Sequence, residues 1–429
     1  KNFMVVNFLF MWIPCQFYTI LEESFFNSLP FYQRMKLYYI SAFICTLLCA
    51  VRAMADNGLA PEVTDLNARD ISFEKEREMP YLTQPFITSL PENKKDQLPV
   101  GALGKQSVRE KAVFLYAKEL ARPSENPKNG KTDSLLIAHR GKLVFESYFR
   151  RGRANFPHYQ MSITKSYTTL AVGRAIQLGY LSMKDLDKPV VHFLNDIKSG
   201  MLTPGADQIT LHQTMHMTTG IRMSNKNIEE IILQPKLLLG QGHLQAYLQF
   251  SAPISPHPRP YKYQPSDPSI TMQVLESVVP GSAKTFIKDE LLRPMGISNY
   301  GWQEDVSGFP KAAAGASLLS RDMIKMGLLI LSRGKWKGIQ HIPESFLEIA
   351  TSPLVQTNEE NFYGYFWWSQ TREINGKKYP MIQGRGAGGQ FIFVFRSLDL
   401  VVVTTAHNQG MGKMLKELPE RMIPAFIKN

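Results

Sequence analysis

Residues 162 to 178 read SITKSYTTLAVGRAIQL, and this apolar stretch gives the clearest structural signal in the chain. It contains few charged residues, and Gly179 follows it, which is typical of a helix that ends in a left-handed C-cap. The helix would open on the spacing S-x-x-K, with Ser162 and Lys165 three residues apart. Residues i and i+3 share a helix face, so the lysine would project beside the serine.

This pair has the chemistry of an activated nucleophile. A serine at a helix N-terminus lies near unpaired N–H groups and the positive end of the dipole, which stabilise a developing oxyanion. A lysine held against an apolar helix is costly to keep charged, so its pKa falls and it can accept the serine proton. The alternative is a helix-capping serine with a surface lysine, and the spacing alone does not separate the two.

The S-x-x-K spacing occurs three times, and the context favours the copy at Ser162. The first copy, at Ser72 and Lys75, lies in a charged stretch, FEKERE, that we expect to be solvated. The third, at Ser332 and Lys335, contains a glycine and indicates a helix end. Ser162 is therefore the predicted nucleophile.

The composition is that of an ordinary globular protein. The 429 residues are 44% hydrophobic and 20% charged, with a net charge of +12. The basic residues are scattered, without a dense tract, so we do not infer binding to nucleic acid. The length allows one large domain or two.

Residues 35 to 55, MKLYYISAFICTLLCAVRAMA, have the pattern of a secretory signal peptide. Cleavage would leave Asp56 as the mature N-terminus in the periplasm or outside the cell, without a membrane span and without any of the three cysteines. We interpret residues 1 to 34 as an upstream reading frame. A membrane anchor over residues 3 to 21 and a lipoprotein site at Cys49 are the alternatives.

The rest of the chain predicts an α+β fold, with an antiparallel sheet built from the two ends and a mostly helical region between them. Residues 56 to 129 would form an arm with one helix at 107–121, followed by one domain over 130–429. Its sheet region would span 130–160, beginning with a hairpin at 133–149, and 310–429. Its helical region would span 161–309. Helices are predicted at 162–178, 209–218, 269–279, 283–292 and 320–332, and strands at 390–395 and 400–403.

Several ordered segments together resemble the serine β-lactamase and penicillin-binding-protein superfamily. These are HYQMSITKSYTTLAVGRAIQLGYL, LDKPVVHFL, ITLHQTMHMTTGI, AAAGASLLSRDMIKMGLLILSRGKW, YGYFWW and GAGGQFIFVFRSLDLVVVTTAHN. The chain is most similar to the class C β-lactamase-like hydrolases, which include esterases, D-amino-acid peptidases and 6-aminohexanoate-dimer hydrolases. The resemblance spans roughly residues 130 to 410.

The resemblance implies a catalytic tyrosine in the stretch PYKYQPSDPSI. Tyr263 matches it best and would shuttle protons, with Tyr261 as the fallback. Asp267 matches an acidic residue often present in the hydrolase branch and is a candidate for substrate binding. Pro265 stands where true β-lactamases have an asparagine that binds the substrate amide, which argues against efficient turnover of β-lactams.

The stretch GRGAGG, residues 384 to 389, matches the dinucleotide fingerprint G-x-G-x-x-G, but its context does not fit. That fingerprint needs a helix after the glycines, whereas FIFVF is typical of a strand. We therefore expect the glycines to let a strand edge approach a substrate.

In the superfamily this place belongs to a K-T-G motif, here replaced by Gly-Arg-Gly or Arg-Gly-Ala. The resemblance implies an oxyanion hole formed by the N–H groups of Ser162 and Ala387. Arg385, Gly386 and Gly388 are candidates for substrate binding, and Arg385 could hold a substrate carboxylate.

His212 and His216 have metal-ligand spacing, but no H-E-x-x-H motif supports a metal, and no cofactor is implied. The predicted function is a serine hydrolase that cleaves small ester or amide substrates through an acyl-enzyme. The alternatives are a D-Ala carboxypeptidase or β-lactamase and, from another class, a non-catalytic penicillin-binding-like sensor. The sequence does not indicate the oligomeric state.

Overall fold

The computed structural model describes residues 59–64, 71–104, 107–123, 126, 128, 130–256 and 259–427. All of them lie in the second of two units into which the chain divides, residues 57–429. The predicted signal peptide and upstream reading frame, residues 1–55, lie outside the described residues.

A nine-stranded antiparallel sheet forms the centre of this unit, in the order β1-β3-β2-β14-β13-β12-β11-β10-β9. Its strands are β1 (Phe86–Thr88), β2 (Thr132–His139), β3 (Lys142–Tyr148), β9 (Val355–Gln356), β10 (Asn361–Tyr363), β11 (Trp368–Ile374), β12 (Lys377–Gly386), β13 (Gln390–Phe395) and β14 (Leu400–Ala406). The first and last thirds of the chain meet where β2 pairs with β14. The predicted α+β class, with a sheet built from both ends, is confirmed.

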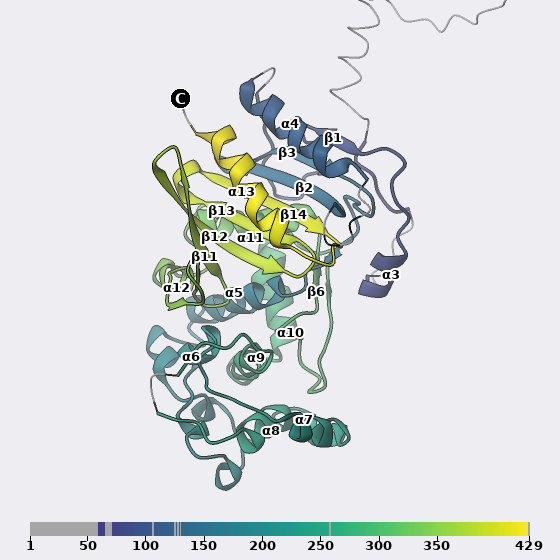
Figure 1. Ribbon diagram of the computed structural model, residues 1–429. Coiled ribbons are helices and arrows are strands. Elements are labelled where there is room, and N and C mark those ends of the chain that lie inside the picture. The colour runs from purple at the N-terminus through teal and green to yellow at the C-terminus, as the bar shows by residue number, and fades with distance from the viewer. Residues whose placement is uncertain are drawn as a thin grey trace, which may run out of the picture. The chain divides into compact units, whose positions relative to one another are not determined.

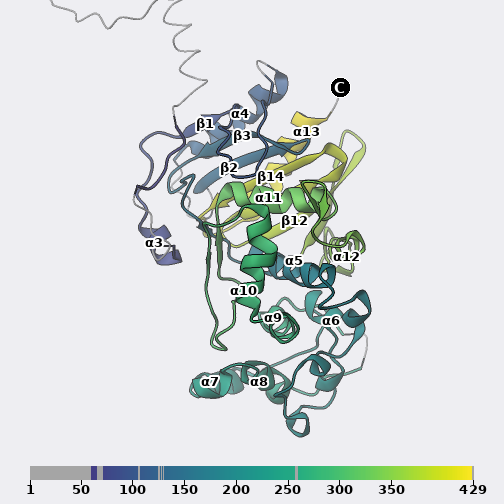
Figure 2. The ribbon, with the colours of Figure 1, turned by 180° about the vertical axis from the view of Figure 1, so that it is seen from behind.

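Helices cover both faces of the sheet, as Figures 1 and 2 show from opposite sides. One face packs against α4 (Val108–Ala121) and α13 (Gly412–Phe426), through an apolar cluster that includes Phe145, Phe393 and Leu418. The other face packs against α11 (Ser320–Leu331) and α5 (Ile163–Gln177). Burial of a sheet on both faces explains why β13 and β14 are apolar at consecutive positions instead of alternating.

The region between the sheet strands is helical and extends away from the sheet (Figure 1). Its helices are α6 (Leu211–Met215), α7 (Asn225–Ile232), α8 (Gly242–Phe250), α9 (Ser266–Val278) and α10 (Ala283–Phe286), the last continuing into a π-helical turn, Ile287–Leu292. Beyond this region α12 (Glu344–Ala350) packs on α5. The small strands are β4 (His158–Tyr159), β5 (Gly301–Trp302), β6 (Ala316–Leu318), β7 (Lys335–Trp336) and β8 (Ile339–Gln340).

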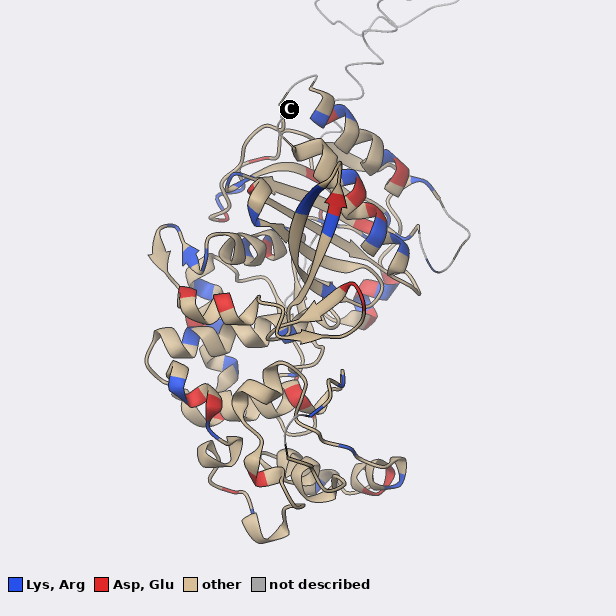
Figure 3. Cartoon of the chain, turned by 60° about the vertical axis from the view of Figure 1, so that its left-hand side comes forward, with Lys and Arg blue, Asp and Glu red and all other residues tan. Residues whose placement is uncertain are grey.

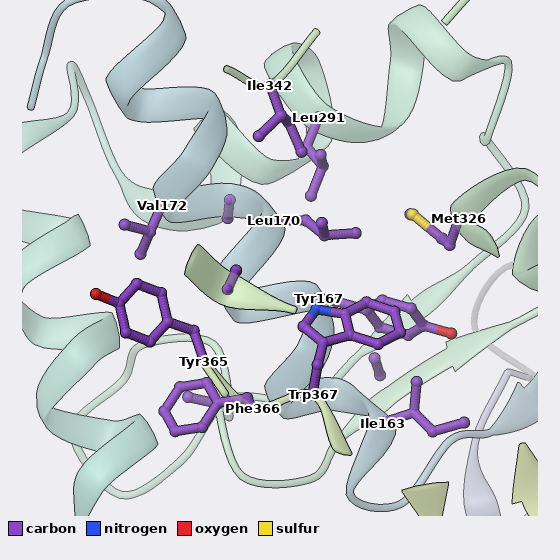
Figure 4. Close-up of a cluster of buried hydrophobic side chains, with 14 of the residues drawn as sticks. Ile163, Tyr167, Leu170, Val172, Leu291, Met326, Ile342, Tyr365, Phe366 and Trp367 are labelled. Atoms are coloured by element: carbon purple, nitrogen blue, oxygen red, sulfur yellow. The ribbon is translucent and has the colours of Figure 1, made fainter. Parts of the chain in front are cut away.

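Helix α5 lies in the middle of the main apolar core. Every residue from Ile163 to Gly173 is buried, and Figure 4 shows side chains of this helix meeting Tyr365, Trp367 and Met326. Burial on all sides explains the absence of a polar stripe. The predicted C-cap is confirmed, because Gly179 has φ 81° and donates to the carbonyl of Ile176. The core therefore fixes the position of the residues at the start of α5.

Helices α3 (Phe73–Glu78) and α13 are among the elements that differ from the sequence expectations. The charged stretch FEKERE forms α3, and Glu76 is buried instead of solvated, because its carboxylate accepts from His158 Nδ1 at 2.8 Å and from the N–H of Tyr159 at 2.7 Å. Helix α13 was not predicted, since Pro419 and Pro424 lie inside it.

Charged residues of both signs are interspersed over the unit (Figure 3), which agrees with the scattered distribution in the sequence. In the part of the chain that the structure describes, no helix has both the length and the apolar character needed to cross a membrane.

Candidate active site

Ser162 stands at the amino end of α5, directly before the first helical residue. The preceding Met161 has φ 48°, a left-handed conformation that costs a non-glycine residue on the order of 1–3 kcal/mol. The N–H of Ile163 donates to the carbonyl of Gln160 at 3.1 Å and closes this turn. The Ser162 hydroxyl makes no capping bond to the helix, so it is available for other partners.

Lys165 is the partner of that hydroxyl. Its Nζ lies 3.1 Å from Ser162 Oγ and donates at 2.7 Å to the carbonyl oxygen of Ala313. The residue is only 4% exposed. Among the described residues it forms no ion pair with a carboxylate, and its Nζ lies 4.8 Å from the centroid of the Tyr263 ring.

Burial without an acidic partner lowers the pKa of Lys165 from 10.5 to about 8. Desolvation disfavours the ammonium, and a neutral carbonyl compensates for it less well than a carboxylate would. The fraction of this lysine that is neutral near physiological pH is therefore much larger than for a solvated lysine, although the ammonium still predominates at pH 7. A neutral amine 3.1 Å from a serine hydroxyl has the distance and the protonation state of a general base.

Tyr263 completes the group around Ser162. It is 41% exposed, and burial of its hydroxyl raises its pKa, while hydrogen bonding with Ser162 opposes that rise. Its ring packs against Tyr363 and Trp368, with centroids 6.1 and 6.0 Å apart. The structure thus brings together the three predicted catalytic side chains.

Tyr261, the fallback for the catalytic tyrosine, lies differently. Its ring packs edge-on against Tyr363 with centroids 5.4 Å apart, and its hydroxyl is buried without a hydrogen-bond partner among the described residues. Burial raises the pKa of Tyr261, and the neighbouring Tyr263 raises it further. Lys165 is not among the charged groups that affect this pKa. The geometry therefore favours Tyr263 for proton transfer.

Asp267 follows Tyr263 by four residues and is enclosed by its neighbours. It is fully buried, and its carboxylate accepts from Gln264 at 2.7 Å, Ser266 at 2.8 Å and Thr219 at 3.0 Å. Burial raises its pKa to about 6, and these hydrogen bonds oppose the rise. Direct contact with substrate, as expected from the sequence, would require this segment to open. The arrangement is that of a side chain that fixes the turn between Tyr263 and α9.

The glycines at the end of β12 pass close to the nucleophile. A Cβ on Gly386 would lie 2.5 Å from the carbonyl oxygen of Gln160, and one on Gly384 would lie 3.5 Å from Ile163. Only glycine allows this approach at residue 386. A turn and then strand β13 follow, with no helix, so the dinucleotide interpretation is excluded as predicted.

Ala387 begins that turn and is exposed at the strand end. A Cβ on its predecessor Gly386 would meet the carbonyl of Gln160, two residues before Ser162, so Ala387 follows the part of β12 that passes close to the segment leading into Ser162. The oxyanion-hole role of its N–H stays a prediction. Gly388 has φ 86°, and its carbonyl accepts from the backbone and side chain of Asn408, so that carbonyl is already engaged.

Arg385 is buried beside the aromatic side chain of Trp368. Its guanidinium lies 4.6 Å from the ring centroid of Trp368 and donates to Gln383 at 2.6 Å and to Asn361 at 2.7 Å. Burial lowers its pKa to about 10, with the charge of Arg372 as the next cause. Trp368 contacts both Arg385 and Tyr263, so a single side chain separates the arginine from Tyr263. Its binding of a carboxylate stays a prediction.

The other two S-x-x-K copies have structural roles. Ser72 caps α3 by accepting from the N–H of Lys75 at 3.2 Å, and Lys75 is exposed. Ser332 Oγ donates to backbone carbonyls of Leu328 and Lys335 at the end of α11. Neither lysine is buried beside its serine, which separates both copies from that at Ser162.

The two spaced histidines pack together, with ring centroids 4.2 Å apart. His212 Nδ1 hydrogen-bonds the hydroxyl of Tyr365, and His216 Nε2 lies 2.8 Å from the hydroxyl of Thr218. Within the described ranges there is no group of three histidine, cysteine or acidic residues that could hold a metal ion.

Sequence reasoning missed three parts of the site. The carbonyl of Ala313 comes from the small-residue run AAAGAS and gave no local signal. The aromatic wall of Tyr363 and Trp368 comes from far along the chain. The third part is an apolar cavity of about 450 Å³ beside Tyr263.

The structure combines a sheet covered by helices on both faces with an S-x-x-K serine at the start of a buried helix. The S-x-x-K motif is that of serine β-lactamases and penicillin-binding proteins. The chain belongs to the β-lactamase family, whose model matches residues 127–424. No curated protein sequence matches the chain.

Solved structures of similar fold include hydrolases. A candidate 6-aminohexanoate-dimer hydrolase from Bacillus anthracis is 17% identical with a TM-score of 0.57, over 85% of this chain and 97% of that one. EstCE1, a hydrolase with promiscuous acyltransferase activity, is 15% identical with a TM-score of 0.55, over 75% of this chain and 100% of that one. A D-stereospecific amidohydrolase from Streptomyces sp. is 16% identical with a TM-score of 0.51, over 73% and 97%. At these identities the likeness establishes the fold.

Proposed function

We propose that the protein is a serine hydrolase that cleaves ester or amide bonds through an acyl-enzyme on Ser162. The observation that carries this proposal is the contact of 3.1 Å between Lys165 Nζ and Ser162 Oγ, in a setting that lowers the pKa of the lysine to about 8. Membership of the β-lactamase family supports it. A structural lysine would more commonly be solvated or paired with a carboxylate.

In the first half of the reaction, Ser162 Oγ attacks the substrate carbonyl carbon while its proton passes to the neutral Nζ of Lys165. The carbonyl oxygen becomes an oxyanion, which the N–H groups of Ser162 and Ala387 would stabilise. The tetrahedral intermediate then collapses. The bond to the leaving group breaks, and that group takes a proton from the Lys165 ammonium through the hydroxyl of Tyr263.

In the second half, water attacks the acyl carbon and gives its proton to Lys165, through Tyr263 or directly. The second tetrahedral intermediate releases the carboxylic acid and returns the proton to Ser162 Oγ. No other reactant is needed, because water supplies both the hydroxyl of the acid and the proton of the leaving group.

Esters and unstrained amides are better candidates than β-lactams. Pro265 occupies the place of the amide-binding asparagine, and it directly precedes α9, where it offers no side-chain donor. The K-T-G lysine is also absent, and Arg385 at that place is engaged with Gln383 and Asn361. Nitrocefin should therefore be cleaved far more slowly than a p-nitrophenyl ester.

The test is hydrolysis of p-nitrophenyl acetate by purified protein and by matched serine variants. Ser162→Ala should reduce kcat by on the order of 10²–10⁴-fold or more, because it removes the nucleophile. Ser332→Ala is the control, since this serine belongs to another S-x-x-K copy, and its activity should equal that of the unmodified protein. Loss of activity in the control with retention in Ser162→Ala would overturn the proposal.

A further inference from the structure

The cavity beside Tyr263 has a volume of about 450 Å³, and the tyrosine segment itself forms one wall, from Lys262 through Ser266. The other walls come from α7 and α8, including Ile228, Ile231 and Ala246. The volume falls within the range of about 300–1,000 Å³ that is typical of small-molecule pockets. The cavity therefore adjoins Tyr263 and is large enough for part of a substrate.

Helix α7 presents an apolar face to this cavity. Ile228, Ile231 and Ile232 follow the i, i+3, i+4 spacing and all line the cavity. Lys226 and Glu230, 3.8 Å apart, pair with each other outside the cavity lining. Although α7 is apolar on one side, none of its residues is buried, and Ile232 is 64% exposed. Exposure of such a face to water is unfavourable, and the free energy falls when an apolar group covers it.

The position of α7 is fixed by polar contacts at its start. Ser224 caps it by accepting from the N–H of Asn227 at 3.1 Å, and Asn227 Nδ2 donates to the carbonyl of Phe250 at the end of α8 at 2.8 Å. Both ribbon views show α7 and α8 side by side (Figures 1 and 2). These polar contacts therefore hold the isoleucine face of α7 at the cavity and leave the cavity itself empty of their side chains.

The chemistry of the walls selects an alkyl chain. The lining has no carboxylate, and its two basic side chains are Lys262, which is exposed, and His243, whose Nδ1 lies 3.5 Å from Asp305. Isoleucine, leucine, methionine and alanine make up most of the remainder. Such walls bind a ligand by removing its apolar surface from water. They offer few hydrogen-bond partners to a polar ligand.

We infer that this cavity takes the alkyl chain of the acyl group, so that the substrates are medium-chain acyl esters in preference to acetyl esters. The inference rests on the proposed function, since it places the acyl chain beside Tyr263 while Ser162 attacks. Each methylene that becomes buried raises kcat/KM by about fourfold, the equivalent of about 0.8 kcal/mol. With partial burial, p-nitrophenyl octanoate should exceed p-nitrophenyl acetate in kcat/KM on the order of 10²-fold.

The experiment compares the octanoate-to-acetate ratio of kcat/KM in the full protein and three variants. Ala246→Phe fills the cavity, and Ile228→Asp places a charge in its wall; each should lower the ratio by about tenfold or more, equal to about 1.4 kcal/mol. Ile339→Asp is the matched control, because Ile339 is 74% exposed on β8 and lies outside the cavity lining. This control should leave the ratio unchanged. If Ala246→Phe does not fold, Ile228→Asp still tests the inference.

The two failures are distinguishable. If hydrolysis depends on Ser162 but octanoate and acetate are cleaved with equal kcat/KM, or if both cavity variants keep the original ratio, the cavity inference is wrong and the proposed function stands. If Ser162→Ala cleaves every ester as well as the unmodified protein, the proposed function is wrong and the inference falls with it.

Discussion

Replacing Lys165 with methionine should make the protein more stable while it removes the activity. The lysine is 4% exposed, and its pKa falls from 10.5 to about 8 because burial disfavours the ammonium. At pH 7 the charged form therefore destabilises the folded state by about 3 kcal/mol. Methionine fills a similar volume without a charge.

The loss of the hydrogen bond to Ala313 offsets part of this gain. An unsatisfied carbonyl costs about 1 kcal/mol, so Lys165→Met should raise the free energy of unfolding by about 2 kcal/mol at pH 7. The melting temperature should rise by about 2–3 °C. Hydrolysis should fall on the order of 10²–10⁴-fold, because the general base is gone.

The pH dependence of this difference has a definite sign. The folded-state pKa lies below the unfolded one, so the penalty is fully present below pH 8 and is lost as the pH rises from about 8 to 10.5. At pH 9.5 it should be about 1.5 kcal/mol, and the advantage of the methionine variant should nearly vanish. Urea unfolding of both proteins at pH 7 and pH 9.5 measures this.

Lys325 provides the matched control, because it is also buried but lies 2.8 Å from Asp322. Lys325→Met should destabilise the protein, since it leaves a buried carboxylate without its partner. If Lys165→Met were destabilising at pH 7, or if its effect did not change with pH, Lys165 would not be an uncompensated amine and the argument for its role as base would fail.

Further predictions concern the other parts of the site and the mature protein. Gly386→Ala should abolish ester hydrolysis, because a Cβ would lie 2.5 Å from a backbone carbonyl beside the nucleophile; normal kcat would refute the close approach. Asp267→Ala should lower stability by about 3 kcal/mol, whereas Asp267→Asn should lose less and keep KM; a large KM effect in the Asn variant would restore a substrate-binding role. The kcat/KM profile should rise with pH through about 8, and Lys165→Arg should lose nearly as much activity as Lys165→Ala; a flat profile would exclude the lysine as base. We also propose secretion, so N-terminal sequencing of exported protein should begin at Asp56, and a start within residues 1–34 would contradict this.

The parts of the site that the sequence predicted are those set by local geometry. Ser162 and Lys165 are three residues apart, so their meeting follows from one turn of helix and needs no knowledge of the fold. The strands at β13 and β14 and the helix α5 were predictable for a similar reason, since their apolar runs and flanking glycines are local signals.

The parts that the sequence did not predict depend on distant segments or on conflicting signals. The carbonyl of Ala313 meets Lys165 across 148 positions, and a backbone oxygen has no residue identity to recognise. Burial of Asp267 could not be read from a stretch rich in proline and polar residues, because its three donors become neighbours only when the chain folds. In α13 the interior prolines conflict with the apolar spacing of Met414, Leu418 and Met422, which in the fold pack against the sheet.

Mapping the acyl group on the protein tests the central claim most directly. The protein would be mixed briefly with p-nitrophenyl octanoate, quenched in acid and digested, and the modified peptide sequenced by mass spectrometry. The account predicts an octanoyl ester on Ser162 in the peptide that contains Met161 and Lys165, and none in the Ser162→Ala variant. An acyl group on Ser72, Ser332 or any other side chain, with Ser162 unmodified, would contradict it.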